Sequence, residues 1–181
     1  RFHAWQAEAF RRAGTDFLFA GIMPALPEII GMARAMAETG LSYIISFMIR
    51  ENGKLPDGTG IHDAIACTDD AVERPPLCYM TNCVHPDVVC RALACECNRT
   101  ETVRRRFRGI QANTSSLPPE ALDASAVLHG ADSAALAEAI ARLSAFMQCK
   151  IVGGCCGTDG THMEAAAERL CGGERGAEMR R

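Results

Sequence analysis

Two short segments of the sequence place cysteine thiols directly after apolar runs. Cys155 and Cys156 are adjacent in VGGCCGTDG, residues 152–160, and Cys83 lies in TNCVHPD, residues 81–87. Cysteine thiolates bind zinc and other soft metal ions, and they are also nucleophiles and redox groups. These three residues are therefore the main candidates for chemistry in this chain.

Glycines surround the cysteine pair. In a regular strand, neighbouring side chains point to opposite faces, so Cys155 and Cys156 could not bind one ion if the strand simply continued. Gly153, Gly154 and Gly157 permit backbone angles that are closed to other residues. We therefore expect the chain to curl here, so that both thiols face one point.

The elements that position these thiols alternate between short strands and longer helices. Runs of β-branched and aromatic residues predict five strands, at residues 17–20, 43–48, 77–81, 109–112 and 150–153. Helical periodicity predicts helices at residues 2–13, 27–39, 61–72, 86–97, 133–147 and 161–170. Asp132 can cap the fifth helix, and Thr161 with Glu164 has the spacing of a capping box.

Continuous apolar strands joined by helices predict an α/β fold with a parallel sheet, either doubly wound or closed into a (β/α) barrel. Both arrangements place their chemistry at the carboxyl ends of the strands. Alternate strands lie about 10 Å apart, and curvature at a barrel mouth brings their ends closer. Cys83, Cys155 and Cys156 can then converge on one zinc ion. Three ligands leave the fourth tetrahedral position open for a thiol, which would bind there as a nucleophilic thiolate.

The composition favours one globular domain that acts on small molecules. Of the 181 residues, 48% are hydrophobic and 23% are charged, and the net charge of -3 gives no general attraction to nucleic acid or membranes. No run reaches the roughly 18 uninterrupted apolar residues of a membrane span. The basic stretch at residues 99–108 predicts a solvated helix face. Ten cysteines among helical and strand-like segments favour a reducing compartment, and we expect a cytoplasmic protein.

Other interpretations of the same residues stay open. The vicinal cysteines alone are as compatible with a redox pair in another α/β fold as with a metal site. His85 could be a ligand, a base or a structural hydrogen-bonding residue. A second metal site on the predicted helix at residues 86–97 is the weaker interpretation of its three cysteines. The remaining cysteines are expected to be core or near-surface thiols: Cys67, Cys78, Cys149 and Cys171.

The motifs TNC at residues 81–83 and GGCCGT at residues 153–158 resemble the two zinc motifs of the homocysteine S-methyltransferase family. FHAWQAEAF at residues 2–10 and ISFMIRENGKLPDGTGIHDAI at residues 45–65 support the resemblance, which extends over about residues 2–171. It implies Zn²⁺ held by three ligands, Cys83, Cys155 and Cys156.

The resemblance also implies an activity, and no catalytic residue beyond the metal ligands. The thiolate of homocysteine, or of a related thiol, would attack an activated methyl group to give methionine, which places the chain in methionine biosynthesis. The methyl donor would be S-methylmethionine, S-adenosylmethionine, betaine or a methylfolate-type compound. Asn82 and Asn113, near the ends of strand-like runs, are expected to contact the substrate.

The implied fold is a (β/α)8 TIM barrel. Residues 1–171 would supply its C-terminal five or so strands with their helices, and residues 172–181 would form a solvated tail. A part-barrel exposes unpaired strand edges, so we expect the chain to fold poorly alone or to require another chain.

The alternative is a non-catalytic or remnant barrel fragment with a structural zinc site. Gly21 stands where family members often carry a glutamate that helps to hold the amino group of homocysteine. This alternative predicts zinc with four protein ligands, or a metal environment that does not change when thiols are added.

Overall fold

The sheet of this protein contains five parallel strands in chain order. In a computed structural model that describes residues 2–117, 121 and 130–178, the strand order is β1-β2-β3-β4-β5. Every pair of neighbouring strands is parallel. The strands span Phe17–Met23 (β1), Ser42–Phe47 (β2), Cys78–Val84 (β3), Phe107–Ala112 (β4) and Ile151–Gly154 (β5). The α/β class and the five predicted strands are confirmed.

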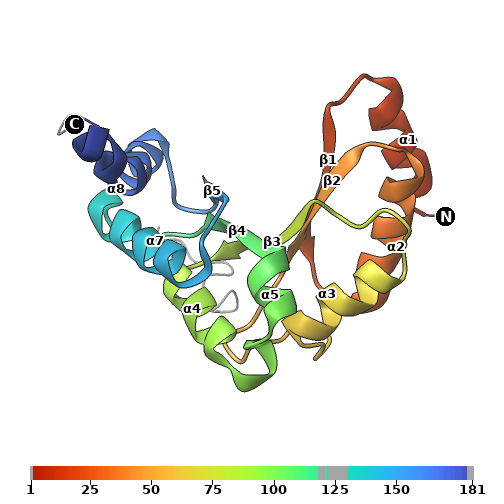
Figure 1. Cartoon of the computed structure of the whole chain (residues 1–181), viewed down its shortest axis with the longest axis horizontal. Coiled ribbons are helices and arrows are strands. Elements are labelled where there is room, and N and C mark those ends of the chain that lie inside the picture. The colour runs from red at the N-terminus through yellow and green to blue at the C-terminus, as the bar shows by residue number, and fades with distance from the viewer. Residues whose placement is uncertain (1, 118–120, 122–129, 179–181) are drawn as a thin grey trace.

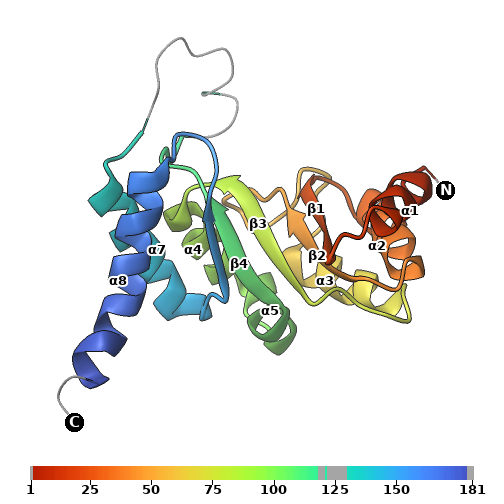
Figure 2. The same ribbon diagram turned by 90° about the horizontal axis from the view of Figure 1, so that it is seen from above.

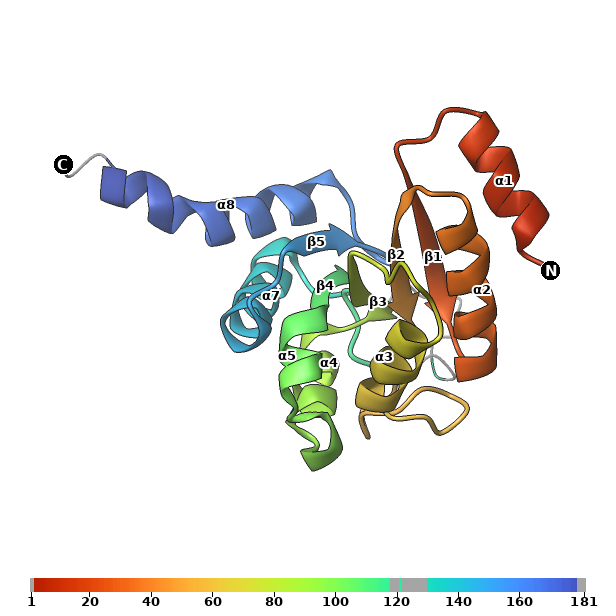
Figure 3. The same cartoon turned by 45° about the vertical axis from the view of Figure 1, so that its right-hand side comes forward.

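Helices follow the strands and form an arc along the sheet (Figure 1). Figure 3 shows α3, α4 and α5 on one side of the strands, and the two chain ends lie at opposite ends of the long axis (Figure 2). The helices span Ala4–Arg12 (α1), Leu26–Glu38 (α2), Ile61–Asp70 (α3), Pro86–Ala94 (α4), Glu101–Arg106 (α5), Ser133–Met147 (α7) and Gly160–Glu178 (α8), with a short 3-10 helix at Glu96–Asn98 (η1).

One of the two predicted helix caps is present. The carboxylate of Asp132 accepts a hydrogen bond of 2.8 Å from the N–H of Ala135 at the start of α7. The predicted capping box at Thr161 is wrong, because Asp159 Oδ1 accepts from the N–H groups of Thr161 and His162 instead. An aspartate reaches the free N–H groups of a first helical turn as well as threonine does. At its other end α8 continues to Glu178, well past the predicted helix end at residue 170.

Aromatic side chains fill the core beneath the middle strands. Phe47, Tyr79 and Phe107 come from β2, β3 and β4, and each is at most 1% exposed. Phe47 stacks on both neighbours, with ring centroids 5.1 Å from Tyr79 and 6.4 Å from Phe107. Such pairs stabilise a core by about 0.5–1.5 kcal/mol beyond the area that they bury. They hold together β2, β3 and β4, of which β3 carries Cys83 and β4 lies beside β5.

An ion pair fixes the amino end of β3. Arg106 at the end of α5 donates to both carboxylate oxygens of Asp69, each at 2.9 Å, and Tyr79 donates to the same carboxylate. Burial opposes the charge on Arg106, but the hydrogen bonds and charge of Asp69 outweigh it and raise the Arg106 pKa. The prediction of a solvated basic face therefore holds for Arg104 and Arg105, which are exposed, and is wrong for Arg106.

Apolar side chains remain exposed at the β1 edge of the sheet. Phe17, Phe19 and Ile22 are 50%, 42% and 52% exposed, and Trp5 on the adjoining α1 is 71% exposed. In the described part of the chain, β1 pairs with β2 alone. An unpaired edge with exposed apolar residues is a site for pairing with another strand or for aggregation. None of the helices in the described ranges is long and apolar enough to cross a membrane.

Candidate metal centre

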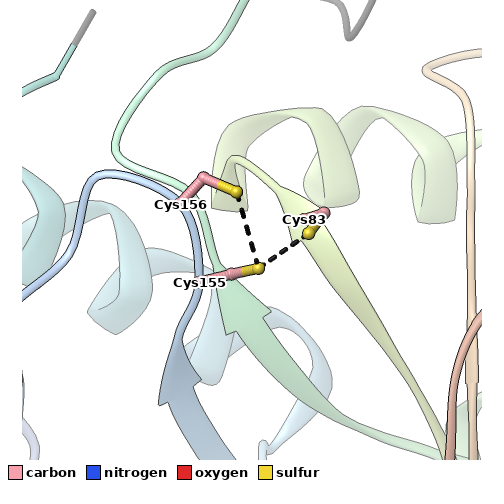
Figure 4. Close-up of side chains that lie close together, drawn as sticks. All are labelled: Cys83, Cys155 and Cys156. Atoms are coloured by element: carbon pink, nitrogen blue, oxygen red, sulfur yellow. Dashed lines mark hydrogen bonds between the residues drawn. The ribbon is translucent and has the colours of Figure 1, made fainter. Parts of the chain in front are cut away.

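The three cysteines selected from the sequence come together at the carboxyl edge of the sheet. Cys83 lies near the end of β3, and Cys155 and Cys156 directly follow β5, with β4 between the two strands. Their three Sγ atoms all lie within 4.8 Å of one another. Figure 4 shows the side chains pointing toward one another. The Sγ of Cys155 is 2.7 Å from that of Cys83 and 3.9 Å from that of Cys156.

An irregular backbone turns Cys83 toward the other two thiols. Cys83 adopts a φ of 56°, and the pairing of β3 with β4 shifts register between Asn82 and Val84. A non-glycine residue in this region costs on the order of 1–3 kcal/mol, and such residues concentrate at functional sites. Ile22 at the end of β1 has a similar φ of 57°. Two neighbouring regions of the carboxyl edge thus depart from regular strand geometry.

A single glycine accounts for the curl of the chain after β5. Gly157 has a φ of 80°, and a Cβ at this position would overlap Thr114 Oγ1. By contrast, Gly153 and Gly154 lie within β5 and do not have a positive φ. The sequence-based expectation that all three glycines permit the curl is therefore correct for Gly157 and wrong for the other two. A Cβ on Gly154 would instead overlap Thr158 Oγ1, so this glycine is needed for close packing.

Asn82 and Asn113 lie at the predicted edge, but each side-chain oxygen already has a protein partner. Asn82, 5% exposed, accepts hydrogen bonds from the N–H of Ile22 and the hydroxyl of Ser46, which joins β1 and β2 to β3. Asn113, 6% exposed, accepts a hydrogen bond of 3.1 Å from the N–H of Cys156. Both oxygens act in building the edge.

Without a cation, the surroundings of Cys83 oppose its ionisation. Burial, then the hydrogen bond and charge of Cys155 and the charge of Cys156, raise the pKa of Cys83 to about 12. Three adjacent thiolates therefore need a positive partner at neutral pH. A divalent metal ion supplies that charge, and its binding releases the thiol protons.

The donor set fits zinc. Tetrahedral coordination with Zn–S bonds of about 2.3 Å places sulfur atoms about 3.8 Å apart. The Cys155–Cys156 distance of 3.9 Å already matches this value, whereas the Cys83–Cys155 distance of 2.7 Å must widen by about 1 Å. Cys156 is exposed and the other two are half-buried, so a fourth ligand can approach from solvent. Within the described residues, this is the only group of three or more metal-ligating side chains that converges.

His85 has a structural role in the protein. Its Nδ1 accepts a hydrogen bond of 3.2 Å from the N–H of Asp87 and so caps α4. Burial lowers the pKa of His85, which favours the neutral imidazole that this acceptor role requires. Of the three interpretations open from the sequence, the structural one describes His85.

Three features of this site were not predicted from the sequence. The positive φ of Cys83, the contacts of Asn82 with two neighbouring strands, and the packing of Thr114 against Gly157 all depend on tertiary structure. The polar residues that follow the β4 run, Asn113 and Thr114, were the available signal, since such residues at strand ends tend to bond nearby backbone.

Comparison with known proteins supports the interpretation of the cysteine motifs. A family model described as homocysteine S-methyltransferase matches residues 1–170. The chain belongs to the homocysteine S-methyltransferase family. A search of curated proteins finds no match.

A solved structure has the same fold. The apo crystal structure of the homocysteine methyltransferase MmuM from Escherichia coli superposes with a TM-score of 0.70 at 21% sequence identity. The match covers 93% of this chain and 55% of the MmuM chain. This family member therefore spans little more than half the length of that enzyme and shares that part of its fold.

Proposed function

We propose that Cys83, Cys155 and Cys156 bind one Zn²⁺ ion and that the protein methylates the thiol of homocysteine to give methionine. The observation that carries this proposal is the convergence of three sulfur atoms, from two strands separated by a third, on the carboxyl edge of the sheet. Family membership supports homocysteine as the acceptor.

The protein side of this chemistry is to hold three sulfurs and leave one side of the site accessible. Zinc, when bound, would lower the pKa of an incoming thiol and keep its sulfur nucleophilic at neutral pH. Cys83 and Cys155 are half-buried, so their surroundings favour metal-bound thiolates over free thiolates. The exposed Cys156 lies on the side of the site that is open to solvent. Asn82 and Asn113 maintain the strand ends that carry these ligands.

The transfer itself exchanges one bond for another. The homocysteine sulfur forms a bond to the methyl carbon while the bond from that carbon to the donor heteroatom breaks, and the electron pair of that bond leaves with the donor. The thiol proton passes to solvent. Donors of this chemistry carry an activated methyl group, as S-methylmethionine, S-adenosylmethionine, betaine and methylfolate-type compounds do. All ten cysteines are free thiols, which suits a reducing compartment such as the cytoplasm.

Zinc stoichiometry in cysteine variants tests the proposal. Wild-type protein should bind one Zn²⁺, and Cys156→Ala should lose tight binding because two thiolates remain. Cys67→Ala is the matched control, since Cys67 is an exposed thiol on α3 outside the cluster, and it should bind like wild type. Full zinc binding by Cys156→Ala would refute the site. Zinc binding without formation of methionine from homocysteine and any of the four donors would favour the non-catalytic fragment.

A further inference from the structure

Asn113 connects the two halves of the cysteine cluster. Its backbone N–H donates a hydrogen bond of 3.0 Å to the carbonyl of Val84, the residue that follows Cys83. Its side-chain oxygen accepts a hydrogen bond of 3.1 Å from the N–H of Cys156. One residue at the end of β4 therefore contacts the backbone beside one candidate ligand and the backbone of another.

The contact with Cys156 lies at the point where the sheet ladder between β4 and β5 ends. The N–H of Cys155 still donates to the carbonyl of Ala112, at 2.8 Å, as in a continuing parallel pair. At the next residue the side-chain oxygen of Asn113 is the acceptor, and the N–H of Thr114 returns a bond of 3.3 Å to the carbonyl of Cys156. Both backbone polar groups of Cys156 are thus bonded to the segment that follows β4.

Burial protects these bonds from competition with water. Asn113 and Thr114 are 6% and 3% exposed, whereas the Cys156 side chain lies at the surface. The hydrogen bond from the Cys156 N–H to the buried Asn113 is part-buried, and losing a partner in such a place is costly, so the Cys156 N–H favours a position within reach of Asn113. The thiol is exposed, but the backbone that carries it is fixed.

We infer that Asn113 is a positioning residue that sets the separation of Cys156 from Cys83. The inference extends the proposed function, because it assumes that these two residues are ligands of one metal ion. It differs from the substrate-binding role expected from the sequence, since the side-chain oxygen is already bonded to the protein. Residues that orient metal ligands typically change affinity by about 10–100-fold when they are replaced.

Amide hydrogen exchange tests the positioning contact without any metal. In the metal-free chain, the Cys156 amide should exchange at least about tenfold faster in Asn113→Ala than in wild type, because its acceptor is gone. Asn113→Asp keeps an acceptor oxygen of the same reach and should restore protection. The amide of Ile110, in the middle of β4, should be unchanged in both variants. If Asn113→Ala does not fold, Asn113→Ser serves instead, because its hydroxyl is too short to reach Cys156.

Zinc affinity, measured by competition with a chelator, tests the consequence for the site. Asn113→Ala should bind one Zn²⁺ with about 10–100-fold lower affinity. Ser115→Ala is the matched control, because Ser115 lies in the same segment and its hydroxyl accepts a hydrogen bond from the nearby N–H of Leu117. Unchanged Cys156 exchange, or unchanged zinc affinity in Asn113→Ala, would overturn the inference. A wild-type chain that binds no zinc would refute the proposed function, while the exchange measurement would still decide the role of Asn113.

Discussion

The turn that follows the cysteine pair allows a quantitative test. Gly157 has a φ of 80°, and a side chain in this region costs about 1–2 kcal/mol. A Cβ on Gly157 would also overlap Thr114 Oγ1 and lie 3.4 Å from Thr114 Cβ. Thr114 is 3% exposed and β-branched, so it cannot rotate away freely, and relief of such overlaps costs about 1–3 kcal/mol. Together the two effects predict about 3 kcal/mol for Gly157→Ala.

We expect the cost of Gly157→Ala to be observed mainly as a lower affinity for zinc. The turn carries Cys156, so Gly157→Ala should lower zinc affinity in a chelator competition by roughly 100-fold, the equivalent of about 3 kcal/mol. The two contributions can be separated in a Thr114→Ala background, which removes the overlapping hydroxyl. There, Gly157→Ala should cost only the conformational 1–2 kcal/mol or so.

Gly160→Ala is the control for the turn, because a Cβ at Gly160 meets no atom within 4 Å and its φ is not positive. It should bind zinc like wild type. A Gly157→Ala protein that binds zinc within threefold of wild type and unfolds at the same urea concentration would contradict the predicted cost. So would a Thr114→Ala background in which Gly157→Ala binds zinc as weakly as it does in the wild-type background.

Three further predictions concern contacts outside the cluster of Cys83, Cys155 and Cys156. Asp69→Asn should lower the free energy of unfolding, measured by urea denaturation, by about 2 kcal/mol, because it weakens a charged, bidentate contact with Arg106. An unchanged urea midpoint would contradict this role. The hydrogen bond to Asp159, followed by the hydrogen bond to the Ala131 carbonyl, raises the pKa of His162. The contact of His162 with Asp159 therefore stabilises the fold fully below the ordinary histidine pKa, and this stabilisation is lost as pH rises through the raised pKa. An NMR titration should show a lower His162 pKa in Asp159→Asn than in wild type. An unchanged pKa would show that Asp159 does not raise it. Phe19→Ser should reduce self-association in light scattering, since Phe19 is 42% exposed on an unpaired edge, whereas equal scattering would show that this edge is not the contact.

The proximity of the three cysteines could be predicted from their positions after strand-like runs. Apolar runs and helical periodicity placed Cys83 and the pair at Cys155 at the same edge, because parallel strands all end at one side of a sheet. The five strands follow from the same pattern. The position of Asn113 at this edge was also visible from its place after a strand.

The local geometry of the site could not be predicted in the same way. The left-handed backbone of Cys83 and the contacts of the Asn82 side chain with two other strands depend on residues far away in the sequence. Asn113 illustrates the limit, since a polar residue at a strand end can face a ligand or bond the neighbouring backbone, and only the path of the chain through Cys156 decides which. Similarly, the inward turn of Arg106 depends on Asp69, in another helix.

X-ray absorption at the zinc edge, with and without homocysteine, distinguishes an open from a closed cysteine site. An open three-cysteine site predicts three sulfurs and one light atom in the protein alone, and four sulfurs once homocysteine is added, because the substrate thiol takes the fourth position. Four sulfurs in both samples would show a closed structural site. Absence of zinc, or an environment that homocysteine does not change, would contradict thiol binding at Cys83, Cys155 and Cys156.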